Sequence, residues 1–287
     1  MVRHLLSLAD LSPHSVRAII EYALVPRAAP LLAGRGAALY FEKPSARTRN
    51  SMELAVKQLG GHPVYLTPPE LGIGTRESVE DIARTLACYH GVICARVFDH
   101  GLLEQLAAAS PVPVVNLLSG RDHPLQALAD LLTIHQLCGR IEGAKIAFVG
   151  DGDNNVARSL AEGCAAMGAE LTVVAPPAYQ LRDGPAGVRQ TCDLAAVAGA
   201  DIVYTDVWVS MGQDGEAEQR MADLAPYQVN EALMAQAPDA HFLHCLPARR
   251  GQEVTAGVID GPRSAVWRQA ENRMHSARGA LMWLLQG

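Results

Sequence analysis

Short apolar runs alternate with helical segments along almost the whole chain, and this alternation most constrains the fold. Such runs lie at residues 37–41, 64–66, 92–95, 112–117, 145–149, 171–175, 201–207 and 241–246. Most of the segments between them carry apolar residues at helical spacing. Strands that alternate with helices predict a parallel sheet covered by helices on both faces. We therefore predict an α/β fold.

The length of 287 residues allows two domains, each with its own hydrophobic core. A second α/β unit begins near residue 139, so we predict domains at residues 1–138 and 139–265. A last helix is expected from about Ser264 to Leu285, and segment 266–287 is expected to pack back on the first domain. Residues 176–192 show no pattern that predicts a conformation.

Charge and cysteine usage limit the class of protein. A net charge of -6 argues against general nucleic-acid binding, which requires a basic face. The six cysteines form no Cys-x-x-Cys pair, which is typical of free thiols in a reducing compartment. No run approaches the roughly 18 apolar residues of a membrane span, and Leu5–Leu8 is too short for a signal peptide. We expect a cytoplasmic protein without membrane or nucleic-acid partners.

The strand–turn–helix pattern around residues 37–59 contains a candidate phosphate site. Ser45 stands where a helix N-cap belongs, so backbone N–H groups point out of the helix start. Arg47 and Arg49 add positive charge, and Ser45 and Thr48 add hydroxyls. Amides, hydroxyls and a guanidinium fork together suit a phosphate dianion. An ordinary capped helix with solvated arginines is the alternative.

His123-Pro124-Leu125-Gln126 begins another helix, with its proline in the favoured first turn. His123 and Gln126 share one helical face, although a capping histidine and a solvated glutamine would give the same pattern. Arg96 ends a strand predicted for the same sheet, and open α/β sheets gather ligand groups at that edge. An arginine and an imidazolium at a carbonyl oxygen would stabilise the oxyanion of acyl transfer. We predict a site for a phosphate joined to a carbonyl, formed by Arg47, Thr48, Arg96, His123 and Gln126.

Residues 150–155, Gly-Asp-Gly-Asp-Asn-Asn, follow a strand and begin a helix. A dinucleotide fingerprint would have glycine in place of Asn155, and an acidic residue after the next strand, where Ala175-Pro176-Pro177 stands. We therefore favour Asn155 as a polar ligand group over a nucleotide cofactor.

Two later strands end in reactive side chains. Asp206 closes one of them and is followed by Ser210 and Met211, and Asp206 could bind an amine or simply cap a loop. His244-Cys245-Leu246-Pro247 ends the last strand and places a thiol at the same edge, although a lone cysteine is usually core. His241 and His244 point to opposite faces of a strand and have no third partner at matching spacing, so we predict no metal and no other cofactor.

The motifs together resemble one family. Phe41 to Arg49 resembles the carbamoyl-phosphate motif of the aspartate/ornithine carbamoyltransferases, and His123–Gln126 resembles their second signature. The motifs at 206–212, 244–247 and 271–275 resemble the ornithine-specific members. The similarity runs in order from Arg3-His4 to the last helix.

The resemblance implies two domains joined by bridging helices, a homotrimer with active sites at subunit interfaces, and transfer of the carbamoyl group of carbamoyl phosphate to the δ-amine of L-ornithine. This reaction gives citrulline and phosphate, in arginine biosynthesis or in the arginine deiminase direction. The resemblance assigns carbamoyl phosphate to Ser45, Ala46, Arg47, Thr48, Arg96, His123 and Gln126. It assigns ornithine to Asn155, Asp206, Ser210 and Met211, and contacts near the reacting groups to Cys245, Leu246 and Arg273. Among these, Arg47, Arg96, His123, Cys245 and Arg273 are the expected catalytic residues.

Two positions depart from the family pattern. Ala46 stands where the family usually has threonine, and Gly72 stands where a glutamine normally reaches the neighbouring subunit's carbamoyl phosphate. The alternatives are a carbamoyltransferase for a related amine (putrescine, an N-acylated ornithine or aspartate), a nucleotide-dependent oxidoreductase, and a non-catalytic binding protein.

Overall fold

The computed structural model describes residues 2–209 and 214–286. The chain forms two compact units: unit 1 comprises Met1–Ala129 with Glu271–Gly287, and unit 2 comprises Asp130–Ala270. The chain passes from unit 1 to unit 2 within helix α6 (Pro124–Cys138) and returns within helix α11 (Val266–Leu285). Each unit contains a parallel sheet flanked by helices, which confirms the predicted fold class.

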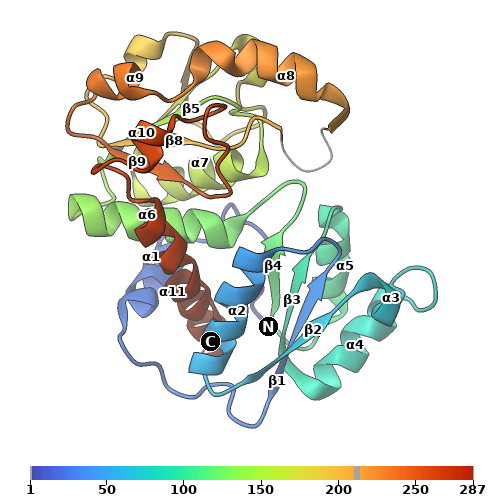
Figure 1. Cartoon of the computed structure of the whole chain (residues 1–287). Helices are drawn as coiled ribbons and strands as arrows, with labels where there is room; N and C mark the ends of the chain where they lie inside the picture. The colour runs from blue at the N-terminus through green and yellow to red at the C-terminus, as the bar shows by residue number, and fades with distance from the viewer. Residues whose placement is uncertain (1, 210–213, 287) are drawn as a thin grey trace. The chain divides into compact units, whose positions relative to one another are not determined.

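Unit 1 has a four-stranded sheet in the order β2-β1-β3-β4, and every pair of neighbours is parallel. Helices α4 and α5 lie on one face of this sheet and α2 lies on the other (Figure 1). Short apolar strands such as Ala37–Phe41 are buried on both faces, as parallel strands require. The elements are α1 (Pro13–Leu24), β1 (Gly36–Phe41), α2 (Ala46–Gln58), β2 (His62–Leu66), α3 (Pro68–Leu71), α4 (Val79–Tyr89), β3 (His90–Arg96), α5 (His100–Ala109) and β4 (Val114–Leu118).

Helix α11 brings the end of the chain into unit 1. The buried Arg278 side chain donates to the carbonyl oxygen of Ala23, at the end of α1, over 3.0 Å. It also donates to Oε1 of Gln58, the last residue of α2, over 3.1 Å. The bond to Ala23 satisfies a backbone carbonyl group at a helix C-terminus, where intrahelical partners run out, and the bond to Gln58 ties α11 to a side chain of α2. Unit 1 is therefore assembled from both ends of the sequence.

Unit 2 has a five-stranded parallel sheet in the order β7-β6-β5-β8-β9. Helix α7 packs on one face, and α9 and α10 pack on the other. The helices and strands are β5 (Lys145–Val149), α7 (Asn155–Met167), β6 (Glu170–Val174), β7 (Arg189–Thr191), β8 (Ile202–Thr205), α8 (Ala217–Leu224), α9 (Glu231–Ala235), β9 (His241–His244) and α10 (Ala256–Ile259), with short 3-10 turns at Pro177–Tyr179, Leu194–Val197, Asp214–Glu216 and Ala225–Tyr227.

Some elements differ from the sequence prediction. Strand β7 and helix α8 were not predicted, because β7 is a three-residue edge strand of polar residues and α8 has only Arg220 and Leu224 buried. The last helix, expected from about Ser264, begins at Val266 instead. Such shifts at element ends do not change which residues follow each strand.

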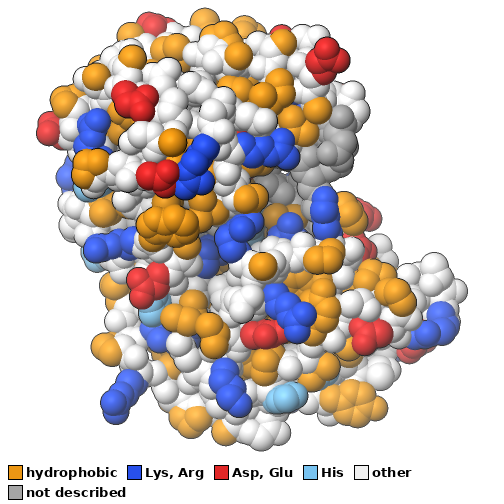
Figure 2. Space-filling view, viewed as in Figure 1, with side chains coloured by type: hydrophobic (Ala, Val, Ile, Leu, Met, Phe, Trp, Pro, Cys, Tyr) orange, Lys and Arg blue, Asp and Glu red, His pale blue; other side chains and the backbone are white. Residues whose placement is uncertain are grey.

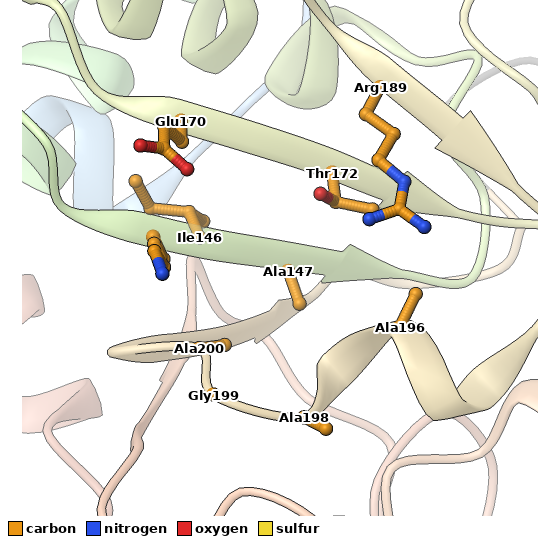
Figure 3. Close-up of a pocket in the computed structure, with 10 residues that line it drawn as sticks. Ile146, Ala147, Glu170, Thr172, Arg189, Ala196, Ala198, Gly199 and Ala200 are labelled. Atoms are coloured by element: carbon orange, nitrogen blue, oxygen red, sulfur yellow. The ribbon is translucent and has the colours of Figure 1, made fainter.

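A shallow groove of about 180 Å³ lies at the amino ends of the strands of unit 2 (Figure 3). Its lining includes the polar residues Lys145, Glu170, Thr172 and Arg189 and four alanines. The groove is thus at the opposite edge of this sheet from Asp206 and Cys245.

Acidic and basic side chains are interspersed over the face shown in Figure 2, so neither sign of charge dominates that face. Within the described residues, no helix is long and apolar enough to cross a membrane.

Candidate active site

In unit 1, Arg96 at the end of β3 meets the start of helix α2. The Arg96 guanidinium donates from Nη1 to Oγ1 of Thr48 over 3.2 Å. Ser45 Oγ donates to the same Thr48 oxygen over 3.1 Å. The sheet edge and the helix start thus come together as the sequence predicted, because β3 pairs with β1 and α2 follows β1 directly.

The start of helix α2 is open to an anion. Ser45 occupies the N-cap position, as predicted, but its side chain makes no capping hydrogen bond. Its hydroxyl is turned to Thr48 instead. The first-turn N–H groups are therefore not occupied by the cap side chain, and the positive end of the helix macrodipole faces outward. Ala46 and Arg47 in this turn are exposed.

Helices α6 and α11 contribute a second part of the cluster. Gln126, one turn into α6, accepts through Oε1 from Nη1 of Arg273 over 2.5 Å. Both side chains are buried, as is His123 immediately before α6. Arg273 lies in the part of α11 that belongs to unit 1. The structure therefore brings together Thr48, Arg96, His123, Gln126 and Arg273, from segments that are far apart in the sequence.

The cluster has an excess of positive charge. Burial, together with the neighbouring Arg273 and Arg47 guanidinium groups, lowers the pKa of Arg96 to about 10. Within the described residues, neither Arg47 nor Arg96 forms an ion pair, and the buried Nε of Arg96 has no hydrogen-bond partner. Buried donors without partners are costly, so an anion bound here would satisfy groups that the protein leaves open.

One electrostatic expectation is wrong. We expected an imidazolium at His123, but burial lowers the pKa of this histidine well below its ordinary value, and Arg273, Arg96 and Arg47 lower it further. Both effects disfavour a positive charge on the ring. His123 is therefore a neutral imidazole, which can still take part in hydrogen bonds to a ligand.

In unit 2, Asp206 and Cys245 form a hydrogen-bonded pair at the ends of strands β8 and β9. Cys245 Sγ donates to Oδ1 of Asp206 over 3.0 Å, and the N–H of Val207 donates to the same oxygen over 2.8 Å. Asp206 is buried and Cys245 is partly buried. The thiol predicted at the sheet edge is thus in contact with the carboxylate predicted beside it.

Among the described residues, one ligand atom each from Asp206, His244 and Cys245 lies within 4.8 Å of the others, a spacing that a metal ion could use. The ring of His244 has other partners, however: Nδ1 accepts from the N–H of Leu246 over 2.9 Å and Nε2 lies 3.2 Å from the buried Glu253. The polar atoms of this group are therefore engaged within the protein.

Of the remaining predicted residues, Asn155 and Leu246 are described by the structure. Asn155 is the first residue of α7, and the capping bonds come from its neighbour Asn154, which accepts from the N–H groups of Val156 and Ala157. Leu246 is partly buried, has φ of +60° and is joined to Pro247 by a cis peptide bond. Ser210 and Met211 lie outside the described residues.

Sequence reasoning missed a buried ion pair beside Asp206. The carboxylate of Asp151 pairs with the guanidinium of Arg220, and both are buried. The two residues are 69 positions apart, so no local spacing connects them. The only sequence signal was the place of Asp151 in the loop that follows a strand.

The structure also shows where the two positions that depart from the family pattern, Ala46 and Gly72, lie. Ala46 is in the exposed first turn of α2. Gly72 ends helix α3 with φ of +61°, and a β-carbon there would lie 2.9 Å from Cβ of Arg76. Arg76 folds back to donate to the carbonyl oxygen of Leu71 over 3.2 Å. A residue larger than glycine at position 72 would therefore require Arg76 to move.

Comparisons with known proteins match both halves of the chain to one family. The carbamoyl-phosphate-binding domain model of the aspartate/ornithine carbamoyltransferases matches residues 3–136, and the aspartate/ornithine-binding domain model matches residues 142–285. The ornithine carbamoyltransferase of Pyrobaculum calidifontis is 47% identical over 304 residues, covering 99% of both chains. That of Bacillus subtilis is 44% identical, covering 99% of this chain and 94% of its own.

Solved structures give the same result. The structure of ornithine carbamoyltransferase from Pyrococcus furiosus matches with a TM-score of 0.93 at 42% identity, covering 99% of this chain and 97% of that one. The enzyme from Thermus thermophilus matches with a TM-score of 0.90 at 43% identity, covering 98% of each chain. The resemblance inferred from the motifs is confirmed, and the chain belongs to the aspartate/ornithine carbamoyltransferase family.

Proposed function

We propose that this protein is an ornithine carbamoyltransferase, which transfers the carbamoyl group of carbamoyl phosphate to the δ-amine of L-ornithine and releases L-citrulline and phosphate. The observation that carries the proposal is identity of 43% to 48% to proteins named ornithine carbamoyltransferase, spread over 98% to 99% of the chain. The basic cluster of unit 1 and the Asp206–Cys245 pair of unit 2 supply chemistry that suits the two substrates.

In this proposal the phosphate lies at the open start of α2. The first-turn amides, the Thr48 hydroxyl and the guanidinium groups of Arg47 and Arg96 neutralise it. Neutral His123 and the Gln126–Arg273 pair face the carbamoyl part, where Arg273 stabilises the oxyanion. The proposed carbamoyl-phosphate residues are Ser45, Ala46, Arg47, Thr48, Arg96, His123 and Gln126.

Ornithine is assigned to unit 2. A buried carboxylate such as Asp206 is suited to an ammonium group, because charge-assisted hydrogen bonds are stronger than neutral ones. Cys245 and Leu246 follow the last residue of β9 directly. The Cys245 thiol donates to the Asp206 carboxylate. The proposed ornithine residues are Asn155, Asp206, Ser210 and Met211, and those proposed near the reacting amine and carbamoyl group are Cys245, Leu246 and Arg273.

The proposed reaction is direct attack without a covalent enzyme intermediate. The lone pair of the neutral δ-amine forms the N–C bond, the carbonyl oxygen gains charge, and the C–O bond to phosphate then breaks. The carbonyl double bond re-forms as the C–O bond breaks, and one amine proton passes to the leaving phosphate, which departs as the dianion HPO₄²⁻. Because carbamoyl phosphate is already activated, the protein chiefly orients the reactants and stabilises charge.

A pH profile tests this mechanism. The δ-amine has an ordinary pKa near ~10.4, as for lysine, so the reactive neutral form is scarce at pH 7. We expect kcat/KM for ornithine to rise steadily from pH 6 to pH 9. Burial and the neighbouring arginines lower the pKa of His123 well below its ordinary value, so a His123→Gln variant should lower kcat/KM and keep the slope of the pH profile. A flat profile in the wild-type chemical step would contradict attack by the free amine.

The substrate itself is tested by a citrulline-type assay of the purified protein with carbamoyl phosphate and four amines side by side: ornithine, putrescine, N-acetylornithine and aspartate. Turnover confined to ornithine is the expected result. Turnover with another of these amines would favour the alternative of a carbamoyltransferase for a related amine and would overturn the role of Asp206. No turnover with any amine would overturn the proposed activity.

The alanine at position 46 gives a further prediction. A threonine there adds a hydroxyl to the first turn of α2, and one more net hydrogen bond to phosphate is worth about 1 kcal/mol. We expect Ala46→Thr to lower KM for carbamoyl phosphate by about fivefold. Ala46→Val has nearly the same shape without the hydroxyl and should leave KM unchanged. Equal effects of both variants on KM would show that the hydroxyl is not involved.

We also propose that residues 1–138 with helix 266–287 form the carbamoyl-phosphate domain and that residues 139–265 form the ornithine domain. The division near residue 139 is supported by the ranges of the two family models, which match residues 3–136 and 142–285. The assignment of the last helix is supported by the grouping of Glu271–Gly287 with unit 1. A homotrimer that works in arginine biosynthesis or in the arginine deiminase direction is proposed from the motif resemblance, and a cytoplasmic location is proposed from the cysteine usage. Free cysteines at all six positions suit a reducing compartment.

A further inference from the structure

Arg220, in helix α8, makes an unusual set of contacts for a side chain with only 7% of its surface exposed. Its Nη2 pairs with Oδ2 of Asp151. Its Nε donates to the backbone carbonyl oxygen of Trp208 over 2.7 Å. The guanidinium also lies 5.0 Å from the ring centre of Tyr179, a distance typical of a cation–π contact.

These contacts join the ends of two neighbouring strands. Asp151 comes two residues after β5, and Trp208 comes three residues after β8, which pairs with β5 in parallel. Asp206, whose carboxylate meets Cys245, lies two residues before Trp208. One guanidinium therefore ties the turn at residues 206–209 to the loop after β5.

The turn at residues 206–209 also packs closely against the end of β5. Gly150 has φ of +115°, and a β-carbon there would lie 3.1 Å from Nε1 of Trp208 and 3.3 Å from Oγ1 of Thr205. Thr205 Oγ1 donates to the carbonyl oxygen of Val149 over 2.6 Å. The Thr205 bond thus fixes the start of the turn to β5, and the Arg220 bond fixes the Trp208 carbonyl group within the turn.

The charges around Asp151 give Arg220 a second effect. The pKa of Asp151 is raised to about 6, chiefly by burial; the nearby Asp206 also raises it, whereas Arg220 lowers it. The positive charge of Arg220 thus offsets the repulsion between the two buried carboxylates of Asp151 and Asp206. Without it, the repulsion would act directly on the carboxylate that the proposed function assigns to ornithine.

We propose that Arg220 is a positioning residue for ornithine: by holding the Trp208 carbonyl and the Asp151 carboxylate at once, it fixes the turn that presents Asp206. This inference rests on the proposed function. It requires arginine, because the planar fork offers several donors in fixed directions, whereas a lysine ammonium acts as a single point charge.

The test is Arg220→Lys, which keeps the charge beside Asp151 and removes the simultaneous bond to Trp208. We expect KM for ornithine to rise at least about tenfold, while KM for carbamoyl phosphate stays within twofold. The matched control is Arg140→Lys, since exposed Arg140 pairs with Asp201 over 3.2 Å at the opposite edge of the sheet. The control should change neither constant.

Hydrogen–deuterium exchange supplies a readout that needs no activity. The N–H of Val207 is bonded to Asp206, so Arg220→Lys should speed exchange in the peptide that contains residues 206–209 and leave α7 unchanged. Unchanged ornithine KM with unchanged exchange would overturn the proposal. Equal loss for both substrates, with faster exchange throughout unit 2, would show a merely structural role and also overturn it.

Failure of the proposed function is distinguishable from failure of this inference. If the wild type does not carbamoylate ornithine, the function fails, and the exchange result still decides whether Arg220 holds the turn. If Arg220→Lys does not fold, Asp151→Asn provides the second variant. It keeps the side-chain shape and removes the charge partner, and it should give the same selective rise in ornithine KM; an unchanged KM would overturn the proposal.

Discussion

Replacing Arg47 by alanine should lower kcat/KM for carbamoyl phosphate by about 10³-fold, which corresponds to about 4 kcal/mol of lost transition-state stabilisation. Arg47 is exposed in the first turn of α2 and forms no ion pair within the described residues. Its charge lowers the pKa of Arg96 and of His123, which places it against the basic cluster. The fold loses nothing by its removal, so the melting temperature should hold while activity falls.

Arg49 provides the matched control two residues along the same helix. Its Nε donates to Glu53 over 2.6 Å, and its guanidinium lies 4.0 Å from the ring centre of Tyr65. Arg49→Ala therefore removes an equal charge whose partners lie within the protein. Steady-state kinetics should show at most a few-fold effect. If Arg47→Ala and Arg49→Ala have the same kinetics, the phosphate assignment at the start of α2 is wrong.

Asp206→Asn should lower kcat/KM for ornithine by about 100-fold, or about 2.7 kcal/mol, and leave carbamoyl-phosphate binding intact. The amide keeps an oxygen that can accept from Val207 and Cys245, so the turn retains its bonds. The variant loses only the negative charge, and a charged partner is worth about 1.5–3 kcal/mol to an ammonium. Initial rates at varied ornithine, together with equilibrium binding of carbamoyl phosphate, measure the two effects separately.

The control for Asp206 lies at the other end of the same strand. Asp201 precedes β8 and accepts from the backbone N–H of Lys145 over 2.8 Å. Asp201→Asn makes the same chemical change at the amino edge of the sheet, away from Asp206. Any cost should appear in the melting temperature, with ornithine KM unchanged. Equal losses of ornithine turnover in the two variants would show that Asp206 does not bind the substrate.

Sequence reasoning placed Arg96, Asp206 and Cys245 at strand ends, and the structure has each of them there. This worked because the β-strand pattern in a parallel sheet is local, and because all strands of such a sheet end at one edge. The helix starts at Ser45 and Pro124 were also predictable, since capping and first-turn proline preferences act over a few residues.

Other features depend on contacts that no local pattern records. The charge state of His123 is set by burial and by arginines from three other segments. The Asp151–Arg220 pair joins residues in different elements, and β7 has no apolar alternation because it is an edge strand. Each of these features follows from tertiary packing, which local residue propensities do not record and can contradict.

The assembly of unit 1 from both ends of the sequence has a consequence for synthesis on the ribosome. A nascent chain that has emerged as far as residue 129 contains every strand of the first sheet, yet it lacks Arg273 and the Arg278 bonds to α1 and α2. N-terminal domains generally begin to fold during translation. Here the basic cluster of unit 1 is completed only after translation has passed unit 2. Termination before residue 273 therefore removes both Arg273 and Arg278, whose partners Gln126 and Ala23 lie in the part of unit 1 that is made first.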